Sequence, residues 1–176
     1  MEQIKVYLCG PINGRTDVEC NDWRAYAKQH LKANTLDPMR RDYRGRELGP
    51  GIADEIVAGD LEDVKACDVV LANCPKPSWG TAMEIRMAKA EYGKTVVVVL
   101  PEGTIPSPWL IHHSDVIVTS VWAAVSWINA MRFPLPLERP QIVTSFEPGD
   151  GSFTTCRLKS DNVWTRVNEE PPVLGV

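Results

Sequence analysis

Two carboxylates, Asp60 and Glu84, stand out as residues that could do chemistry in this sequence. Asp60 falls near the middle of an apolar helical stripe formed by Ala53, Ile56, Val57, Leu61 and Val64. A carboxylate that faces a protein interior costs several kcal/mol unless it has partners. We therefore interpret Asp60 either as a buried carboxylate tied to backbone donors or as a proton donor whose pKa is raised by burial.

Glu84 closes the pattern Thr81-Ala82-Met83-Glu84, which has the spacing of a capping box. One interpretation is that Glu84 only satisfies a backbone N–H group at a helix start. The other follows from its position, because the predicted helix begins directly after a strand, at the carboxyl edge of a sheet. The helix N-terminus stabilises negative charge there and keeps a carboxylate ionised. Covalent attack on a sugar carbon needs such an ionised carboxylate in a cleft.

The two carboxylates flank the same predicted strand, one on the helix before it and one on the helix after it. Two carboxylates in different environments can divide the work of glycosidic cleavage: one attacks C1′ of the sugar, and the other manages protons or orients the sugar. Tyr7, near the end of the first predicted strand, is either a core aromatic or a hydrogen-bond donor that aims Glu84. We predict Glu84, Asp60 and Tyr7 as the catalytic residues.

The loops that follow the predicted strands carry candidate binding residues. Residues 10–15, Gly-Pro-Ile-Asn-Gly-Arg, form either a plain tight turn or a loop that offers N–H groups and a guanidinium to a phosphate. The Walker A and dinucleotide spacings are both missing. Arginines crowd the polar stretch 39–51, where they are either a solvated face or a clamp on an anionic substrate: Arg40, Arg41, Arg44 and Arg46. Trp79 and Trp109 could stack on a base or simply pack.

The elements that position these residues alternate along the chain. The patterning predicts strands at 4–9, 35–37, 68–74, 95–100 and 116–119, with helices starting at Thr16 and covering 52–66, 80–92 and 121–131. Such alternation predicts an α/β fold with a five-stranded parallel sheet sandwiched by helices. Ligands bind at the carboxyl ends of strands in these sheets, and here those ends precede the loops after Cys9, Asp37 and Cys74.

The tail from residue 133 onward is rich in proline and differs from the rest. Two possible strands, 141–146 and 153–158, flank Gly149-Asp150-Gly151 and predict a β-hairpin packed on the main domain or on a neighbouring subunit. We therefore predict a catalytic domain at 1–132 and a C-terminal extension at 133–176.

Composition limits the kind of partner. The chain has 176 residues and a formal net charge of −4, which argues against gripping a nucleic-acid backbone and leaves a small anionic ligand possible. There is no apolar run of membrane-spanning length and no signal-peptide pattern, so we expect a cytoplasmic protein that does not enter a membrane. The five cysteines form no Cys-x-x-Cys pair and the histidines have no ligand spacing, so no metal site is predicted.

Three segments, in this order and spacing, resemble the nucleoside 2-deoxyribosyltransferase family, including its 2′-deoxynucleoside 5′-monophosphate N-hydrolase branch. They are Lys5-Val6-Tyr7-Leu8-Cys9-Gly10-Pro11-Ile12, Gly59-Asp60-Leu61 with Ala66-Cys67-Asp68-Val69-Val70, and Pro77-Ser78-Trp79-Gly80-Thr81-Ala82-Met83-Glu84. The resemblance covers residues 4 to 130. It implies a flavodoxin-like sheet and a homo-oligomer, a dimer or larger, with active sites near subunit contacts. The chemistry needs no metal or redox cofactor.

The resemblance implies that Glu84 is the nucleophile, that Asp60 takes the place of the family's helix aspartate, and that Tyr7 orients the nucleophile. Arg15 and Ser78 match the positions that contact the 5′-phosphate in the hydrolase branch. Transferases acting on free nucleosides often carry an Asp at the position of Ser78, and an Asp would repel a phosphate. The predicted substrate contacts are Gly10, Ile12, Asn13, Gly14, Arg15, Asp37, Arg40, Ser78, Gly80 and Thr81.

The sequence therefore predicts an enzyme that cleaves or transfers at the N-glycosidic bond of a 2′-deoxynucleoside or its 5′-monophosphate through a covalent glycosyl-Glu84 intermediate. One alternative is a non-catalytic nucleotide sensor on the same fold. Another is an assembly protein in which the C-terminal hairpin is the working part and the carboxylates are caps or core polar groups.

Overall fold

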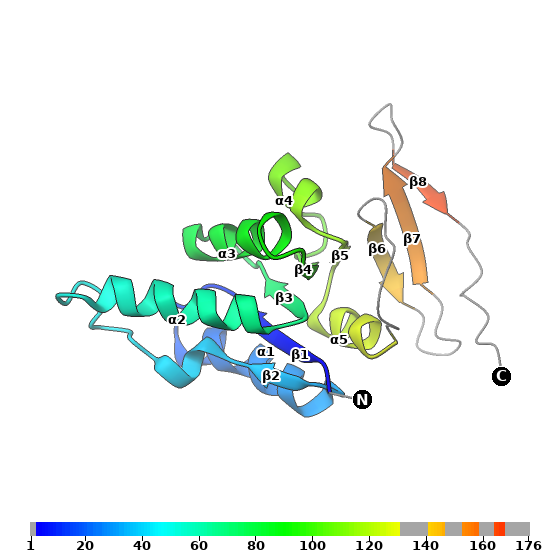
Figure 1. The fold of residues 1–176 in the computed structure, drawn as a ribbon. Helices are drawn as coiled ribbons and strands as arrows, with labels where there is room; N and C mark the ends of the chain where they lie inside the picture. Colours follow the sequence, from blue (N-terminus) through cyan, green and yellow to red (C-terminus); the bar gives the residue numbers. More distant parts are fainter. Residues whose placement is uncertain (1–2, 131–140, 147–152, 159–163, 168–176) are drawn as a thin grey trace.

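The computed structural model describes residues 3–130, 141–146, 153–158 and 164–167, with side chains described in the first of these ranges. Its centre is a parallel sheet with the strand order β2-β1-β3-β4-β5 (Figure 1). This is the strand order of a flavodoxin-like sheet, so the predicted five-stranded parallel fold is confirmed. The strands are β2 (Asn34–Leu36), β1 (Lys5–Cys9), β3 (Val69–Asn73), β4 (Thr95–Val99) and β5 (Val116–Val118).

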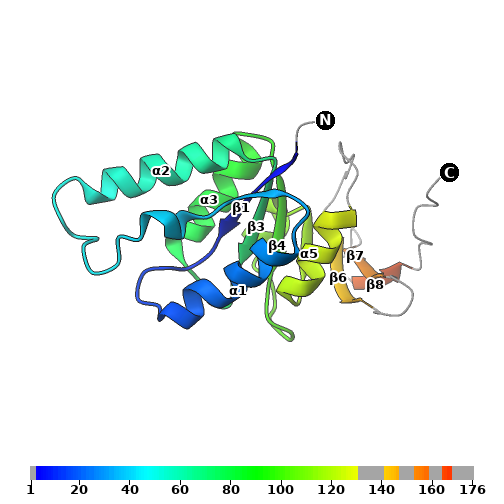
Figure 2. The ribbon, with the colours of Figure 1, turned by 90° about the horizontal axis from the view of Figure 1, so that it is seen from below.

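Helices cover both faces of this sheet (Figures 1 and 2). One face carries α1 (Asp17–His30) and α5 (Val121–Ala130), and the other carries α2 (Ile52–Ala66), α3 (Trp79–Ala90) and α4 (Pro108–His113). The short helix α4 was not predicted; it begins at a proline and is capped by the hydroxyl of Ser107.

The alternation of side chains along β1 decides which residues reach the α2–α3 face. Val6 and Leu8 pack in the core cluster beneath α1 and α5, while Tyr7 and Cys9 pack in the cluster beneath α2 and α3. Successive side chains of a strand point to opposite faces, so residues two apart share one face. Tyr7 and Cys9 therefore both lie on the side of the sheet that carries Asp60 and Glu84.

The predicted start of α1 is confirmed and that of α3 is wrong in detail. Thr16 caps α1, and its hydroxyl and the Glu19 side chain form the reciprocal bonds of a capping box. Helix α3 instead begins at Trp79 with Ser78 as its cap, and no side chain caps it. Glu84 thus lies in the second turn of α3 and makes no capping box with Thr81.

The segment between β2 and α2 contains a short 3-10 helix, η1 (Pro38–Arg41), within the stretch predicted as a long loop. The carboxylate of Asp37 caps it by accepting a hydrogen bond of 3.0 Å from the backbone N–H of Met39. This turn packs against α2 and carries two of the arginines of the segment towards it.

The predicted C-terminal hairpin is present at the predicted strands, β6 (Gln141–Phe146) and β7 (Phe153–Leu158). Strand β6 pairs in parallel with β5, so the hairpin continues the main sheet, and the unpredicted strand β8 (Trp164–Val167) pairs antiparallel with β7. The predicted boundary at 132 and 133 and the Gly149-Asp150-Gly151 turn lie outside the described residues. None of the described helices has the length and apolarity needed to span a bilayer.

Candidate active site

A cavity of about 280 Å³ opens at the carboxyl ends of β1 and β3. These two strands are the point at which the strand order of the sheet reverses, where ligands bind in open α/β sheets. The volume is close to the lower end of the range of about 300–1,000 Å³ that is typical of small-molecule sites. The lining residues are Gly10, Ile12, Asn13, Pro38, Arg41, Asp42, Tyr43, Arg44, Glu47, Ile56, Asp60, Ser78, Gly80, Thr81 and Glu84.

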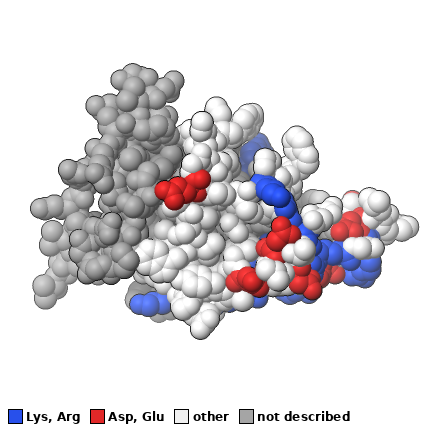
Figure 3. Space-filling model, turned by 180° about the vertical axis from the view of Figure 1, so that it is seen from behind, with Lys and Arg blue, Asp and Glu red and all other residues white. Residues whose placement is uncertain are grey.

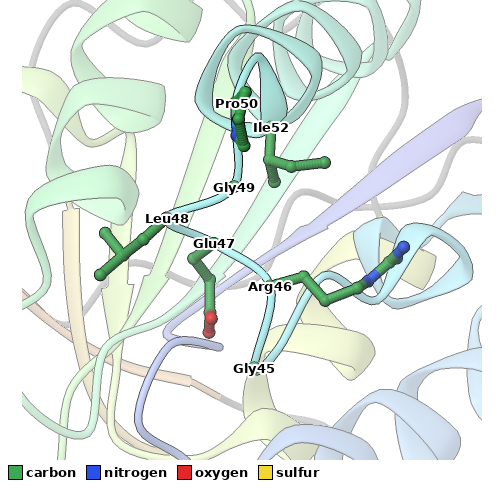
Figure 4. A pocket seen from close by; sticks show the side chains of 7 residues that line it. All are labelled: Gly45, Arg46, Glu47, Leu48, Gly49, Pro50 and Ile52. Carbon is green, nitrogen blue, oxygen red and sulfur yellow. The ribbon is translucent and has the colours of Figure 1, made fainter.

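A second cavity, of about 520 Å³, is larger but carries no comparable chemistry. A single segment, residues 45–50 with Ile52, lines it (Figure 4). The side chain of Leu48 stands fully exposed there, and the charged side chains of Arg46 and Glu47 come from the same turn. Because this cavity is lined by one stretch of chain and contains neither Asp60 nor Glu84, we place the candidate site in the smaller cavity.

Glu84 is held from three sides. The hydroxyl of Tyr7 donates a hydrogen bond of 3.0 Å to Oε1, and the thiol of Cys9 donates one of 2.7 Å to Oε2. The third contact is a side-chain hydrogen bond with Asp60 across the cavity wall. The carboxyl group therefore has both oxygens engaged and a fixed direction, while the residue still lines the cavity.

The surroundings of Glu84 raise its pKa to about 7, chiefly because the group is buried and secondly because Asp60 lies beside it. The pKa of Asp60 is also raised by burial, although Arg41 opposes that rise. The hypothesis that the helix N-terminus alone keeps Glu84 ionised is therefore wrong, since the residue lies beyond the first turn, where that effect fades. Burial and the charge of Glu84 raise the pKa of Cys9, so its thiol stays protonated and donates.

Asp60 faces the cavity from α2 and is bound to the segment before that helix. Nη2 of Arg41 donates a hydrogen bond of 3.0 Å to Oδ1 of Asp60 and one of 2.7 Å to Oδ2 of Asp63. Asp63 is only 4% exposed and also pairs with Arg40. Asp60 is thus neither a carboxylate bound only to backbone nor an isolated acid.

The helical stripe predicted for α2 is rotated from the observed one. Asp63 is not part of the predicted stripe but is buried, whereas Val57 is part of it and is 56% exposed. The reason is that the arginines of η1 supply partners for Asp63, which removes the cost of burying its charge. Asp60 itself points inward as predicted.

The loop after β1 is fixed by a buried arginine that the sequence analysis missed. Arg24 is fully buried on α1 and donates to the carbonyl oxygens of Leu8, Cys20 and Gly10. A Cβ atom at Gly10 would lie 3.0 Å from the carbonyl oxygen of Asn73, so this position favours glycine. The signal was available, because Arg24 shares the helical spacing of the buried residues Cys20 and Ala27.

The structure brings most of the predicted substrate contacts to the cavity, but not all of them. Gly10, Ile12, Asn13, Ser78, Gly80 and Thr81 line it. Gly14, Arg15, Asp37 and Arg40 are not among the lining residues. Asp37 is buried and paired with Arg24 and Lys28, and Arg15, which precedes α1, pairs with Glu19 in the first turn of that helix.

The N-terminus of α3 forms one wall of the cavity. The hydroxyl of Ser78 makes no cap hydrogen bond, and the first N–H groups of a helix have no partner within the helix. Such a terminus attracts anions. The aromatic residue that lines the cavity is Tyr43, whereas Trp79 and Trp109, the two predicted candidates for base stacking, are 87% and 72% exposed and line no part of it.

Charge is mixed around the cavity. Its lining includes the arginines Arg41 and Arg44 and the carboxylates Asp42, Glu47, Asp60 and Glu84. Arg44 is itself paired with Asp42 and with Asp17. Figure 3 shows acidic and basic side chains interleaved towards the right of the view, with no continuous basic surface on that face. Within residues 3–130, no cluster of His, Cys, Asp and Glu has an arrangement that would hold a metal ion.

Comparison with known proteins gives the family and the fold of this chain. No curated protein matches the sequence. Structural matches include a 2-deoxyribosyltransferase of Bacillus psychrosaccharolyticus, with TM-score 0.59 and 18% identity over 73% of this chain and 93% of that one. A conserved protein of Enterococcus faecalis V583 matches with TM-score 0.51 and 17% identity over 82% and 92% of the two chains. A CMP N-glycosidase of Clostridium botulinum matches with TM-score 0.46 and 20% identity over 71% and 97%.

The two matches with the higher TM-scores show a shared fold. The sequence itself matches the model of the nucleoside 2-deoxyribosyltransferase family over residues 6–108, which is more than half of the chain. That range contains every residue found around Glu84, from Tyr7 on β1 to the start of α3. The chain is therefore an enzyme of the nucleoside 2-deoxyribosyltransferase family.

Proposed function

We propose that this enzyme breaks the N-glycosidic bond of a 2′-deoxynucleoside 5′-monophosphate or of the matching nucleoside, through a covalent bond between C1′ and Glu84. The observation that carries this proposal is the fixed carboxyl group of Glu84, which lines the cavity with Tyr7 and Cys9 donating to its two oxygens. A carboxylate aimed in this way is prepared for attack on an electrophilic carbon.

In the first step, an oxygen of Glu84 bonds to C1′ while the bond from C1′ to the base nitrogen breaks, leaving its electron pair on the base. Asp60 gives its proton to that base and becomes a carboxylate. In the second step, water or a second base attacks C1′, the bond to Glu84 breaks, and Asp60 takes a proton from the incoming group. Two displacements at C1′ retain the anomeric configuration.

The carboxyl pair supports this division of labour. Burial raises the pKa of both groups, and the charge of Asp60 raises that of Glu84 further, so the pair holds one proton below about pH 7. The hydrogen bond between the two groups raises the pKa of Glu84 and lowers that of Asp60, so Glu84 holds the shared proton at rest. The reactive form arises when that proton passes along the hydrogen bond to Asp60 and leaves Glu84 ionised. We therefore expect kcat/KM to fall as the pH rises through about 7, when the shared proton is lost, and to fall again in acid, when both groups are protonated.

A phosphate is supported by the N-terminus of α3. Ser78, Gly80 and Thr81 line the cavity there, and the uncapped helix start offers N–H groups. Arg15 is less directly placed, because its guanidinium pairs with Glu19 and it does not line the cavity. We expect Ser78→Ala to weaken a 5′-monophosphate by about tenfold, with little effect on the nucleoside. Equal effects on the monophosphate and the nucleoside would reject the proposed phosphate site at the N-terminus of α3.

The same proposal includes a cytoplasmic homo-oligomer and a catalytic domain that ends near residue 132. Apolar side chains on α3 and α4 support self-association, since Trp79, Met83 and Trp109 are between 63% and 87% exposed. The four described cysteines are free thiols, as expected in a reducing compartment.

The test is chromatography of the purified protein with a panel of deoxynucleosides and their 5′-monophosphates, with and without a free acceptor base. Free base released without an acceptor identifies a hydrolase, and a new nucleoside or nucleotide formed only with the acceptor identifies a transferase. Glu84→Ala should lose at least about 10³-fold in turnover while it still binds substrate. Unchanged turnover in this variant would reject Glu84 as the nucleophile, and binding without any turnover by the parent protein would favour a sensor.

A further inference from the structure

Arg41 lies between two carboxylates of α2 that have different surroundings. Asp60 lines the cavity, and its side chain is 20% exposed, whereas the side chain of Asp63 is 6% exposed. One nitrogen, Nη2, donates to both, at 3.0 Å to Asp60 and 2.7 Å to Asp63. The guanidinium therefore joins the cavity carboxylate to a buried carboxylate that does not line the cavity.

The position of Arg41 is fixed by more than these two bonds. A Cβ atom at Gly59 would lie 2.7 Å from Nε and 3.0 Å from Cζ of Arg41, so only glycine leaves room for the guanidinium beside the helix. The turn that carries Arg41 is capped by Asp37, and Asp37 is in turn held by Lys28 and Arg24. Contacts within the protein therefore fix the position of Arg41 without a bound substrate.

The charges around Asp60 come from four elements. Arg41 on η1 favours its carboxylate form, and Asp63 on α2 and Glu84 on α3 place further charge beside it. Tyr7 on β1 completes the set as a neutral hydroxyl, whose pKa is raised by burial and by Glu84. Of these groups, only Arg41 brings positive charge into direct contact with Asp60.

We propose that Arg41 is a positioning residue that stabilises the Asp60 carboxylate formed when its proton passes to the leaving base, and that Asp63 sets the strength of this effect. The inference rests on the proposed function, because it gives Asp60 a proton to donate. In that step the O–H bond of Asp60 breaks, an N–H bond forms on the base, and the electron pair stays on the oxygens that face Arg41. No further reactant is required.

The two partners should act in opposite directions. Without the guanidinium, Asp60 holds its proton more tightly, so the shared proton survives to higher pH and is given up less readily. The negative charge of Asp63 partly offsets the effect of the Arg41 guanidinium on Asp60. Without that charge, the pKa of Asp60 is lower, so the shared proton is lost at lower pH. If Arg41 and Asp63 served only to stabilise the fold, their removal would not shift the pH dependence in opposite directions.

The kinetic test compares the pH dependence of kcat/KM in Arg41→Gln, Asp63→Asn and Arg41→Lys. We expect the high-pH decline to move upward by about half a pH unit or more in Arg41→Gln, with an activity loss of about tenfold, and downward in Asp63→Asn. Arg41→Lys restores a charged donor and should bring the decline back towards its original position. Asp115→Asn is the matched control, since this buried carboxylate pairs with Lys89, precedes β5 and does not line the cavity.

A second measurement separates this inference from the proposed reaction. Carboxyl carbon-13 NMR in a Glu84→Gln background follows the titration of Asp60 directly, and Asp60→Asn identifies its signal by difference. The Asp60 pKa should rise with Arg41→Gln and fall with Asp63→Asn, whatever the turnover. If the Asp60 pKa moved in the same direction in both variants, or did not move, the assignment of Arg41 and Asp63 would be overturned. If the pKa moved in opposite directions but the parent protein showed no turnover, only the proposed reaction would be rejected.

Discussion

The thiol of Cys9 donates a hydrogen bond to Oε2 of Glu84, the carboxylate oxygen that Tyr7 does not contact. Both donors come from β1, two residues apart, and both side chains are fully buried. From the sequence, the cysteines were given no part in the predicted site. The structure instead gives one of them a direct contact with the proposed nucleophile.

Removal of this thiol should change kinetics more than stability. Without its donor, Glu84 is less stable as a carboxylate, so we expect Cys9→Ala to lower kcat/KM by about tenfold and to move the high-pH decline upward. Cys9→Ser keeps a donor and should retain most of the activity. The control is Cys67→Ala, because Cys67 is an equally buried thiol that bonds to the carbonyl oxygen of Val64 and precedes β3, away from the cavity. A similar kinetic loss in this control would rule out a specific role for Cys9.

Burial of Glu84 should also make stability depend on pH. Its pKa is raised from 4.5 to about 7, so within that window the folded protein holds a proton that the unfolded chain has released. Stability therefore falls as the pH rises from about 4.5 to about 7, by an amount on the order of 3 kcal/mol, and levels off above it. Urea unfolding at pH 5 and pH 8 measures this change. The neutral variant Glu84→Gln should lack it, and an identical pH dependence in both proteins would contradict the assignment.

Gly59→Ala should separate activity from stability. Alanine favours a helix over glycine by about 1 kcal/mol, so α2 alone predicts an unchanged or higher Tm. The added Cβ atom would lie 2.7 Å from Nε of Arg41 and displace the guanidinium from Asp60. We expect kcat/KM to fall by about tenfold with only a small change of Tm, because Arg40 still pairs with Asp63 and the helix gains stability; steady-state kinetics and thermal unfolding measure the two. Full activity in this variant would show that catalysis does not require the Arg41 guanidinium at its observed position beside Asp60.

The exposed apolar side chain of Met83, 63% accessible on α3, should lie in a contact between copies of the chain. Met83→Glu places a charge there and should shift the protein towards a smaller species in light scattering. Val57→Glu, at a position 56% exposed on α2, is the matched control and should leave the assembly unchanged. A monomeric parent protein would reject the predicted oligomer.

Most of the sheet could be predicted from the sequence because its strands are short apolar runs between helical patterns. The strand Thr95–Val99, four valines after a threonine, is buried almost throughout and has only one reasonable interpretation. The predicted helix at 52–66 agrees with α2 residue for residue. Helix α4 and strand β8 were missed, because six and four residues are too few for periodicity to be visible.

The site was predicted less completely, for a physical reason. The pairing of Glu84 with Asp60 follows from the strand between them, but the contacts of Asp63 and Arg41 depend on how η1 folds back onto α2. An apolar-stripe argument locates the buried face of a helix from its apolar residues, so it misses Asp63, which is buried because arginines neutralise its charge. The donor role of Cys9 was hidden in the same way, since a buried thiol looks like any small apolar side chain.

The contacts that hold Glu84 span long stretches of chain: 77 residues separate it from Tyr7 and 75 from Cys9. Contacts at such separation form only after a large loop has closed, and closure is slow and entropically costly. No early folding intermediate that lacks the pairing of β1 with β3 can therefore hold the proposed nucleophile in place. During refolding, turnover should return only with completion of the sheet, so the reaction itself reports that the chain has reached its native topology.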